Sequence, residues 1–287
     1  LPIWRKSVLI CCNISFISAC LIRILSANIA LKPDIFNNFV IFASTKLQNH
    51  KKMRLLLISN STNPGEAYLD YPKEHIKNFL GDRAKNAIFI PYAAVTFSYD
   101  EYEEKVNNRF AEIGHHVTGI HRFINPVEAI ENADAIVVGG GNTWQLVKIL
   151  QEKGLMKVIR KRVKKGTPYI GWSAGSNIAC PTLKTTNDMP IVEPDKFKTL
   201  KLVPFQINPH YLDDHPANHG GETREVRINE FIEVNRDLFV VGLREGTMLL
   251  LEDKELVLVG ERNARIFKFG EEPRELSHED DFNFLLS

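Results

Sequence analysis

The serine with the clearest potential for chemistry is Ser173, in the stretch YIGWSAGSNIAC from Tyr169 to Cys180. Gly171 and Gly175 lie two residues before and after it, which is the G-x-S-x-G spacing of a nucleophile elbow. In such an elbow a strand turns sharply into a helix, and glycine is needed where a Cβ would clash with the crossing backbone. The preceding TPYIGWS is typical of a buried strand, and AGSNIAC of the first turns of a helix. One such pattern also arises by chance, so a nucleophile at Ser173 needs partners elsewhere.

Backbone donors for an oxyanion are available next to a second apolar run, ADAIVVGGGN. In open parallel sheets, ligands bind at the carboxyl ends of the strands. There Gly141 lets the main chain approach a ligand closely, Asn142 follows it, and Ala174 would open a helix with its N–H free. A phosphate loop is disfavoured, because no lysine follows the glycines and the G-x-G-x-x-G spacing is absent.

A serine nucleophile also needs a base, and His210 in QINPHY is the best-placed of nine histidines. It stands at the end of an apolar run, where a strand would bring it to the edge of the site. The later Asp213, Asp214, His215 and His219 raise the possibility of a metal, but H-x4-H-x3-H fits no standard zinc pattern. We therefore predict no metal and no cofactor.

Two acidic residues could orient the histidine. Glu245 in VVGLREGT follows a predicted strand, and Asp188 in TTNDMP is the alternative. Position in the sequence does not decide between them. With Glu245 the order along the chain is Ser, His, Glu, whereas α/β-hydrolases place the acid before the histidine. That order indicates a different α/β architecture.

The elements that must position these residues begin after Met53. Apolar runs alternate with segments of helical spacing, which predicts right-handed βαβ units and a parallel sheet covered on both faces. The tail, with LFVVG, TMLLLEDKELVLVG and ARIFKFG, predicts a hairpin or an antiparallel edge. We predict a single α/β domain over 53–287, with strands in Arg54–Ser59, Asn86–Pro91, His115–Ile120, Ala133–Asn142 and Thr167–Ser173, and helices in Ser98–Gly114 and, interrupted at Gly154, Thr143–Gly166.

Residues 1–52 differ in composition from the rest. They hold seven Lys/Arg against one acid, Asp34, and three of the four cysteines; the remainder has 29 basic and 34 acidic residues. The apolar run SVLICCNISFISACLI is shorter than the ~20 residues of a membrane span but long enough for a signal peptide. We interpret 1–52 as a non-core extension, translated from upstream of a start at Met53, with a targeting segment for export or an organelle as the alternative.

Charge and cysteine usage restrict the class of protein further. The net charge of +1 gives no support for nucleic-acid binding, and the core domain shows no membrane segment. Cys180 is the sole cysteine after residue 52, so the core can form no internal disulfide, as expected of a reducing compartment. We predict a cytoplasmic protein, unless 1–52 direct it elsewhere.

From Met53 to about Gly270 the chain resembles peptidase E, the α-aspartyl dipeptidase family of serine peptidases. The resemblance rests on separate stretches in the same order: LLLISNSTNPG, VTGIHR, VVGGGNT, YIGWSAGSNIACPT, TTNDMPIV, QINPH and GETRE. It implies a flavodoxin-like α/β fold akin to class I glutamine amidotransferases, with a mainly parallel sheet flanked by helices and a nucleophile elbow. Ser176 departs from the family pattern, since alanine is common after WSAG.

The same resemblance implies a role for each candidate. Ser173 matches the nucleophile, His210 the base and Glu245 the acid, while Asp188 matches an aspartate that has also been considered for the acid. The backbone of Gly141 and Ala174 would form the oxyanion hole.

The implied reaction is cleavage of dipeptides with N-terminal aspartate, without a metal. Such a substrate needs a group that recognises its side-chain carboxylate, and the planar fork of arginine does so in a bidentate manner. Arg224 in GETRE is the candidate, with an ion pair to Glu225 or Glu222 as its alternative role, and Asn142 is a second predicted substrate contact.

Two other functions stay open at this point. One is a hydrolase of the same fold for another acidic amide, such as a cyanophycinase-like enzyme acting on a β-aspartyl polymer. The other is a non-catalytic binding protein. The sequence gives no oligomeric state.

Overall fold

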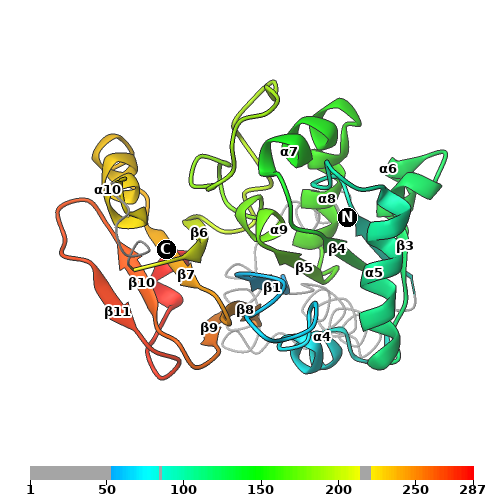
Figure 1. Cartoon of the computed structure of the whole chain (residues 1–287), viewed down its shortest axis with the longest axis horizontal. Helices are drawn as coiled ribbons and strands as arrows, with labels where there is room; N and C mark the ends of the chain where they lie inside the picture. The colour runs from blue at the N-terminus through cyan, green and yellow to red at the C-terminus, as the bar shows by residue number, and fades with distance from the viewer. Residues whose placement is uncertain (1–52, 84–85, 214–220) are drawn as a thin grey trace, which may run out of the picture. The chain divides into compact units, whose positions relative to one another are not determined.

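The computed structural model describes residues 53–83, 86–213 and 221–287 (Figure 1). Residues 1–52 lie outside the described part, so the boundary at residue 52 stays a prediction. The larger of two sheets has seven strands, in the order β3-β2-β4-β5-β1-β8-β9. Five strands are parallel, as predicted: β1 (Leu55–Ile58), β2 (Ala87–Ile90), β3 (Val117–Gly119), β4 (Ala135–Val138) and β5 (Tyr169–Trp172). The predicted antiparallel edge is confirmed in β8 (Met248–Glu252) and β9 (Glu255–Val259).

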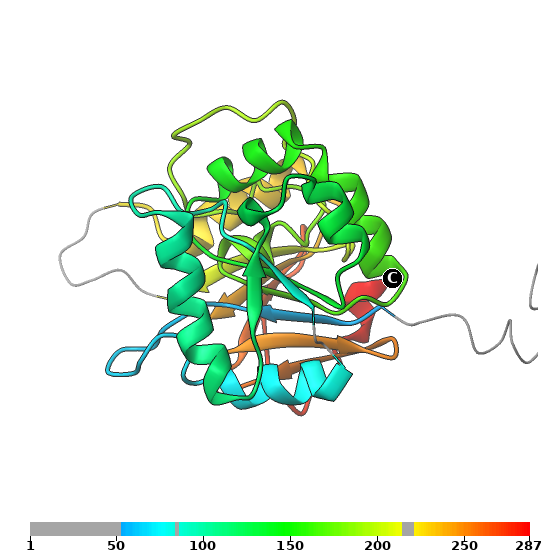
Figure 2. The same ribbon diagram turned by 90° about the vertical axis from the view of Figure 1, so that its right-hand side faces the viewer.

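Alternation along the strands divides the interior between two faces of this sheet (Figure 2). In β1, Leu55 and Leu57 belong to one apolar core, and Leu56 and Ile58 to the other. The first core is covered by α6 (Pro126–Glu131), α7 (Thr143–Glu152), α8 (Leu155–Lys164) and α9 (Ala174–Asn177); the second by α4 (Lys73–Leu80) and α5 (Tyr99–Glu112).

Local signals in the sequence explain where α5 begins and where α7 ends and α8 begins. Ser98 and Glu101 form a capping box that starts α5, because each side chain bonds the other residue's backbone N–H. The predicted interruption at Gly154 is confirmed, since this residue takes a left-handed conformation with φ 67° between α7 and α8. Within the described residues, no helix combines the length and apolarity needed to cross a membrane.

A second, four-stranded sheet, in the order β11-β10-β7-β6, was not separated from the first by the sequence analysis. It lies beside the first sheet in Figure 1. The strands β6 and β7 pair in parallel, and α10 (Arg224–Val234) connects them. This sheet consists of β6 (Gln206–Tyr211), β7 (Val240–Arg244), β10 (Ala264–Phe267) and β11 (Arg274–Leu276), and three short 3-10 helices complete the described elements: Gly81–Arg83, Ile120–Arg122 and Asn283–Leu286.

Candidate active site

Ser173 lies on a sharp turn between β5 and α9, as the elbow motif predicts. Its backbone has φ 53° and ψ −112°, a conformation that non-glycine residues adopt rarely. A Cβ on Gly171 would lie 2.5 Å from the Gly175 carbonyl oxygen, and one on Gly175 would lie 2.3 Å from that of Val138. Both glycines of the motif are therefore required by close approach of backbone, and the turn presents the serine side chain at the carboxyl edge of the sheet.

His210 joins Ser173 to Glu245 by hydrogen bonds. The distance from His210 Nε2 to Ser173 Oγ is 3.0 Å, and from His210 Nδ1 to Glu245 Oε1 it is 2.7 Å. An ionised carboxylate only accepts hydrogen bonds, so Nδ1 donates to Glu245. In the neutral imidazole this leaves Nε2 as the acceptor for the serine hydroxyl. The arrangement can remove a proton from Ser173 and stabilise the resulting imidazolium.

Asp188, the alternative acid, lies elsewhere in the site. Its Oδ2 accepts hydrogen bonds from Thr143 N at 2.8 Å, Thr143 Oγ1 at 2.6 Å and Thr186 Oγ1 at 2.9 Å. Its backbone oxygen accepts one from Trp144 Nε1 at 3.1 Å. Among the described residues no hydrogen bond connects Asp188 to His210. Asp188 therefore fixes the beginning of α7, directly after the glycines that would supply an oxyanion donor.

The predicted oxyanion donors lie at two backbone turns. Gly141 has φ 131°, and a Cβ there would lie 2.3 Å from the Ala93 carbonyl oxygen. Its neighbour Gly140 packs against Ser173: a Cβ added to Gly140 would lie 3.0 Å from the Cβ of Ser173. The first N–H groups of a helix have no intrahelical acceptor. Within the described ranges, the amides of Gly141 and Ala174 donate to no protein acceptor, so both are available to a ligand.

The side chain of Asn142 is engaged within the protein at both ends. Its oxygen accepts from Gln145 N at 3.0 Å and caps α7, and its nitrogen donates to the Met189 carbonyl at 2.9 Å. The predicted contact of Asn142 with substrate stays a prediction. Ser176, the second hydroxyl of the motif, is fully buried and donates to main-chain carbonyls, with Ile58 O at 2.7 Å and Gly171 O at 2.8 Å.

A cavity of about 380 Å³ opens in front of Ser173 and His210. Arg224, at the start of α10, is half-buried in its wall. Burial and the positive charge of Arg227 lower the pKa of the Arg224 guanidinium, while the negative charge of Asp188 opposes that shift. The lining residues are Thr143, Ser173, Thr186, Asn187, Asp188, Pro209, His210, Leu212, Arg224 and Glu245.

Glu225 and Glu222, the alternative ion-pair partners considered for Arg224, pair with other arginines. Glu225 pairs with Arg265 at 3.0 Å, and Glu222 lies 3.6 Å from Arg227. In the part of the chain that the structure describes, Arg224 forms no ion pair with a carboxylate. Among these residues, the acidic group that acts on Arg224 is Asp188, through its charge and without a direct ion pair.

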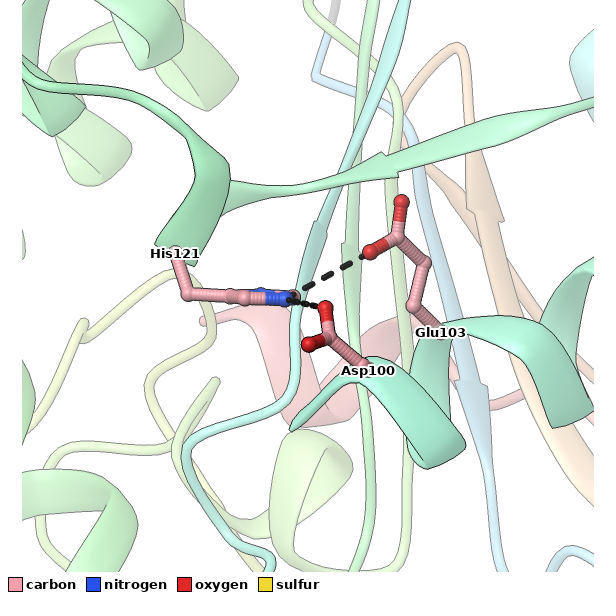
Figure 3. Close-up of side chains that lie close together, drawn as sticks. All are labelled: Asp100, Glu103 and His121. Carbon is pink, nitrogen blue, oxygen red and sulfur yellow. Dashed lines mark hydrogen bonds and ion pairs between the residues drawn. The ribbon is translucent and has the colours of Figure 1, made fainter. Parts of the chain in front are cut away.

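A separate cluster of titratable side chains lies between α5 and the turn after β3 (Figure 3). His121 Nε2 is 3.0 Å from Asp100 Oδ1 and 3.5 Å from Glu103 Oε2, and the three could in principle hold a cation. However, Arg122 already binds both acids, at 2.8 Å from Asp100 and 2.6 Å from Glu103. Because the Arg122 guanidinium already pairs with both carboxylates, we interpret the cluster as an ion-pair and hydrogen-bond network that holds α5 against this turn.

The sequence analysis gave no role to the residues that support the site from behind, above all Thr143, Thr186, Ser59 and Asn60. All four are polar, and three are fully or almost fully buried: Ser59, Asn60 and Thr143. Thr143 and Thr186 stand within the stretches VVGGGNT and TTNDMPIV, and Ser59 and Asn60 within LLLISNSTNPG. Polar residues directly after a buried strand were the available signal for the last two.

A serine on a strand-to-helix elbow, hydrogen-bonded through histidine to a carboxylate at the edge of a mostly parallel sheet, defines the class of α/β serine hydrolases. The model of Peptidase family S51 matches residues 55–259. The chain therefore belongs to this family and is a serine-type peptidase.

Relatives and solved structures agree with this. The chain is 55% identical over 233 residues to "Peptidase E" of Nostoc sp., covering 81% of this chain and 96% of that protein. It is 51% identical over 220 residues to "Peptidase E" of Salmonella typhimurium, covering 77% and 96%.

Two crystal structures share the fold at low sequence identity. A peptidase from an acI-B1 Actinobacterium matches with a TM-score of 0.60 at 18% identity, covering 83% of this chain and 99% of that one. A putative peptidase E from Listeria monocytogenes matches with 0.54 at 22%, covering 72% and 98%. These structures confirm the predicted α/β fold class. The predicted family and a serine dipeptidase activity are confirmed by the family model and the curated relatives.

Proposed function

We propose that this serine dipeptidase hydrolyses dipeptides with N-terminal aspartate, using Ser173 as nucleophile, His210 as general base and Glu245 as the acid that orients it. The observation that carries the proposal is the continuous chain of hydrogen bonds from Ser173 Oγ through both ring nitrogens of His210 to Glu245. This chain opens into a cavity whose wall holds an arginine without a carboxylate partner among the described residues.

In the first half of the reaction, His210 Nε2 takes the proton of Ser173 as Oγ attacks the peptide carbonyl carbon. Glu245 stabilises the imidazolium, and the amides of Gly141 and Ala174 hold the oxyanion. One such donor contributes about 3–4 kcal/mol to transition-state stabilisation. His210 then gives the proton to the leaving amine, and the C–N bond breaks to leave an acyl-enzyme on Ser173. In the second half, water attacks this ester, again with His210 as base, and releases aspartate.

Arg224 supports the proposed preference for aspartate. A half-buried guanidinium without a carboxylate partner binds a substrate carboxylate more strongly than an exposed one, because less water competes for it. We infer that Arg224 receives the side-chain carboxylate of the N-terminal residue.

The test is a substrate panel with matched arginine variants. Purified protein is assayed on Asp-Leu, Glu-Leu and Asn-Leu, with and without a metal chelator. We expect cleavage of Asp-Leu alone, at a rate that the chelator does not change. Arg224→Ala should lower kcat/KM on Asp-Leu about 100-fold, which lies in the range found when one partner of a buried charge pair is truncated. Arg227→Ala, which removes a neighbouring exposed arginine, is the control and should have little effect.

Three results would oppose the proposal. An equal loss on every dipeptide in Arg224→Ala would show that Arg224 does not read the aspartate side chain. Turnover in Ser173→Ala close to that of the wild type would remove the nucleophile assignment. Cleavage of a β-aspartyl polymer in preference to Asp-Leu would indicate the cyanophycinase-like alternative instead.

A further inference from the structure

The last residues of β1 and its following turn contact the backbone at all three proposed catalytic residues. The Ile58 carbonyl accepts a hydrogen bond from Ser173 N at 3.0 Å. Ser59 Oγ accepts one from His210 N at 3.0 Å. Asn60 Oδ1 accepts one from Gly246 N, next to Glu245, at 2.9 Å. Three consecutive residues of one strand end therefore hold the nucleophile, the base and the loop of the acid.

The contact from Ser59 matters most, because His210 sits on an irregularity of β6. The register between β6 and β7 runs from Pro209 opposite Leu243 to Tyr211 opposite Arg244, so His210 is an extra residue without a partner on β7. Its φ of 53° is unusual for a residue with a side chain. A bulge of this kind re-aims a side chain but leaves its backbone unpaired in the ladder.

Ser59 supplies the missing partner. Its side chain is fully buried, and its hydroxyl donates to the Leu243 carbonyl at 2.7 Å while accepting from His210 N. One hydroxyl thus connects the backbone of the base to β7, two residues before Glu245. In addition, Ser59 N donates to the Thr247 carbonyl at 3.0 Å, on the far side of the acid.

Asn60 fixes the other end of the acid's loop. It is fully buried, and its Oδ1 accepts from Tyr71 OH at 2.8 Å as well as from Gly246 N. Its Nδ2 donates to the Thr62 carbonyl and to Asn63 Oδ1, both at 2.9 Å. The carboxamide is therefore held in one orientation, with its oxygen towards the loop that carries Glu245.

We propose that Ser59 is a positioning residue for catalysis, whose hydroxyl aligns His210 between Ser173 and Glu245 by completing the backbone hydrogen bonding of the bulge. Asn60 assists by holding the loop of the acid. Neither side chain lines the substrate cavity, so both act through the catalytic residues and not on the substrate. This inference rests on the proposed roles of Ser173, His210 and Glu245.

The test compares two variants of equal shape, Ser59→Thr and Ser59→Val. Each adds the same bulk, and only threonine keeps the hydroxyl, so strain from the added methyl group cancels in the comparison. We expect kcat on Asp-Leu to be at least tenfold higher in Ser59→Thr than in Ser59→Val, with KM values within about threefold of each other. The rate of Ser173 labelling by an organophosphorus serine reagent should differ by a similar factor, because that reaction also requires the histidine.

A matched control separates alignment from stability. Thr199 is also buried, and its Oγ1 donates to a main-chain carbonyl, that of Cys180, away from the site. Thr199→Val should lower the thermal midpoint about as much as the midpoint of Ser59→Val falls below that of Ser59→Thr. It should nevertheless leave kcat unchanged.

Equal kcat and labelling rates in the two folded Ser59 variants would overturn the proposal. If the larger side chains prevent folding, Ser59→Ala is compared with the wild type, and a kcat within twofold of wild type overturns it as well. Activity in Ser173→Ala would instead count against the proposed function, so the two failures are distinguishable.

Discussion

Replacing Glu245 by glutamine removes the charge next to His210 while keeping a side chain of similar shape. Two unit charges about 4 Å apart interact by about 1 kcal/mol in water and about 4 kcal/mol at an effective dielectric constant of about 20. The side chains of His210 and Glu245 are 38% and 29% exposed, so the interaction lies between these limits. A loss of about 2–3 kcal/mol of transition-state stabilisation corresponds to a decrease in kcat of about 30- to 150-fold.

The assay measures kcat and KM on Asp-Leu together with the labelling rate of Ser173 by an organophosphorus reagent. Glu245→Gln should lower kcat and the labelling rate with little change in KM. Glu261→Gln removes an exposed charge from a second cavity that Glu245 also lines, and it should leave both rates near wild type. Asp188→Asn is the decisive comparison. If it slows labelling 30-fold or more while Glu245→Gln stays within threefold of wild type, the assignment of the acid is refuted.

Two further variants are expected to change the stability of the fold. Gly175→Ala should lower the free energy of unfolding, measured in urea, by about 1–3 kcal/mol, as overpacking does. The reason is that the alanine Cβ would lie 2.3 Å from the Val138 carbonyl oxygen. An unchanged urea midpoint would contradict this close approach. Arg244 hydrogen-bonds Asp213 and Glu275 and thereby lowers the pKa of both carboxyl groups. These pairs stabilise the fold above the unfolded pKa values of about 3.9 and 4.3, and the stabilisation is lost as pH falls through the lower folded values. In Arg244→Met, the free energy of unfolding at pH 7 should be lower than in the wild type. The decrease in stability between about pH 5 and 3, followed by circular dichroism, should also be shallower. Parallel pH curves for the two proteins would show that these ion pairs do not cause the loss of stability at low pH.

The sequence was informative where the physics is local. The G-x-S-x-G spacing predicted the turn at Ser173, because a tight elbow restricts which side chains fit within five residues. Helix signals were equally local: the predicted break at Gly154 is confirmed, and the helix predicted from Ser98 begins there with a capping box that the sequence analysis did not point out. Apolar runs located the five parallel strands, although each is shorter than its apolar run.

The sequence could not assign β6, β7, β10 and β11 to a separate sheet, because strand pairing depends on long-range contacts. Nor did it indicate that His210 occupies a bulge with positive φ, or that Ser59 would meet its backbone from 151 residues away. These are contacts between segments that approach each other after both sheets have formed.

The choice between Glu245 and Asp188 shows the division most clearly. The sequence by itself determined the types of residue available: a serine at an elbow, a histidine and two acids that each follow a strand or loop near the site. Only the tertiary structure decided that Glu245 lies 2.7 Å from His210 Nδ1 while Asp188 bonds Thr143 at the start of α7. The physical reason is that a hydrogen bond is set by distances of a few tenths of an ångström, and these follow from the packing of two sheets and not from the order of residues along the chain.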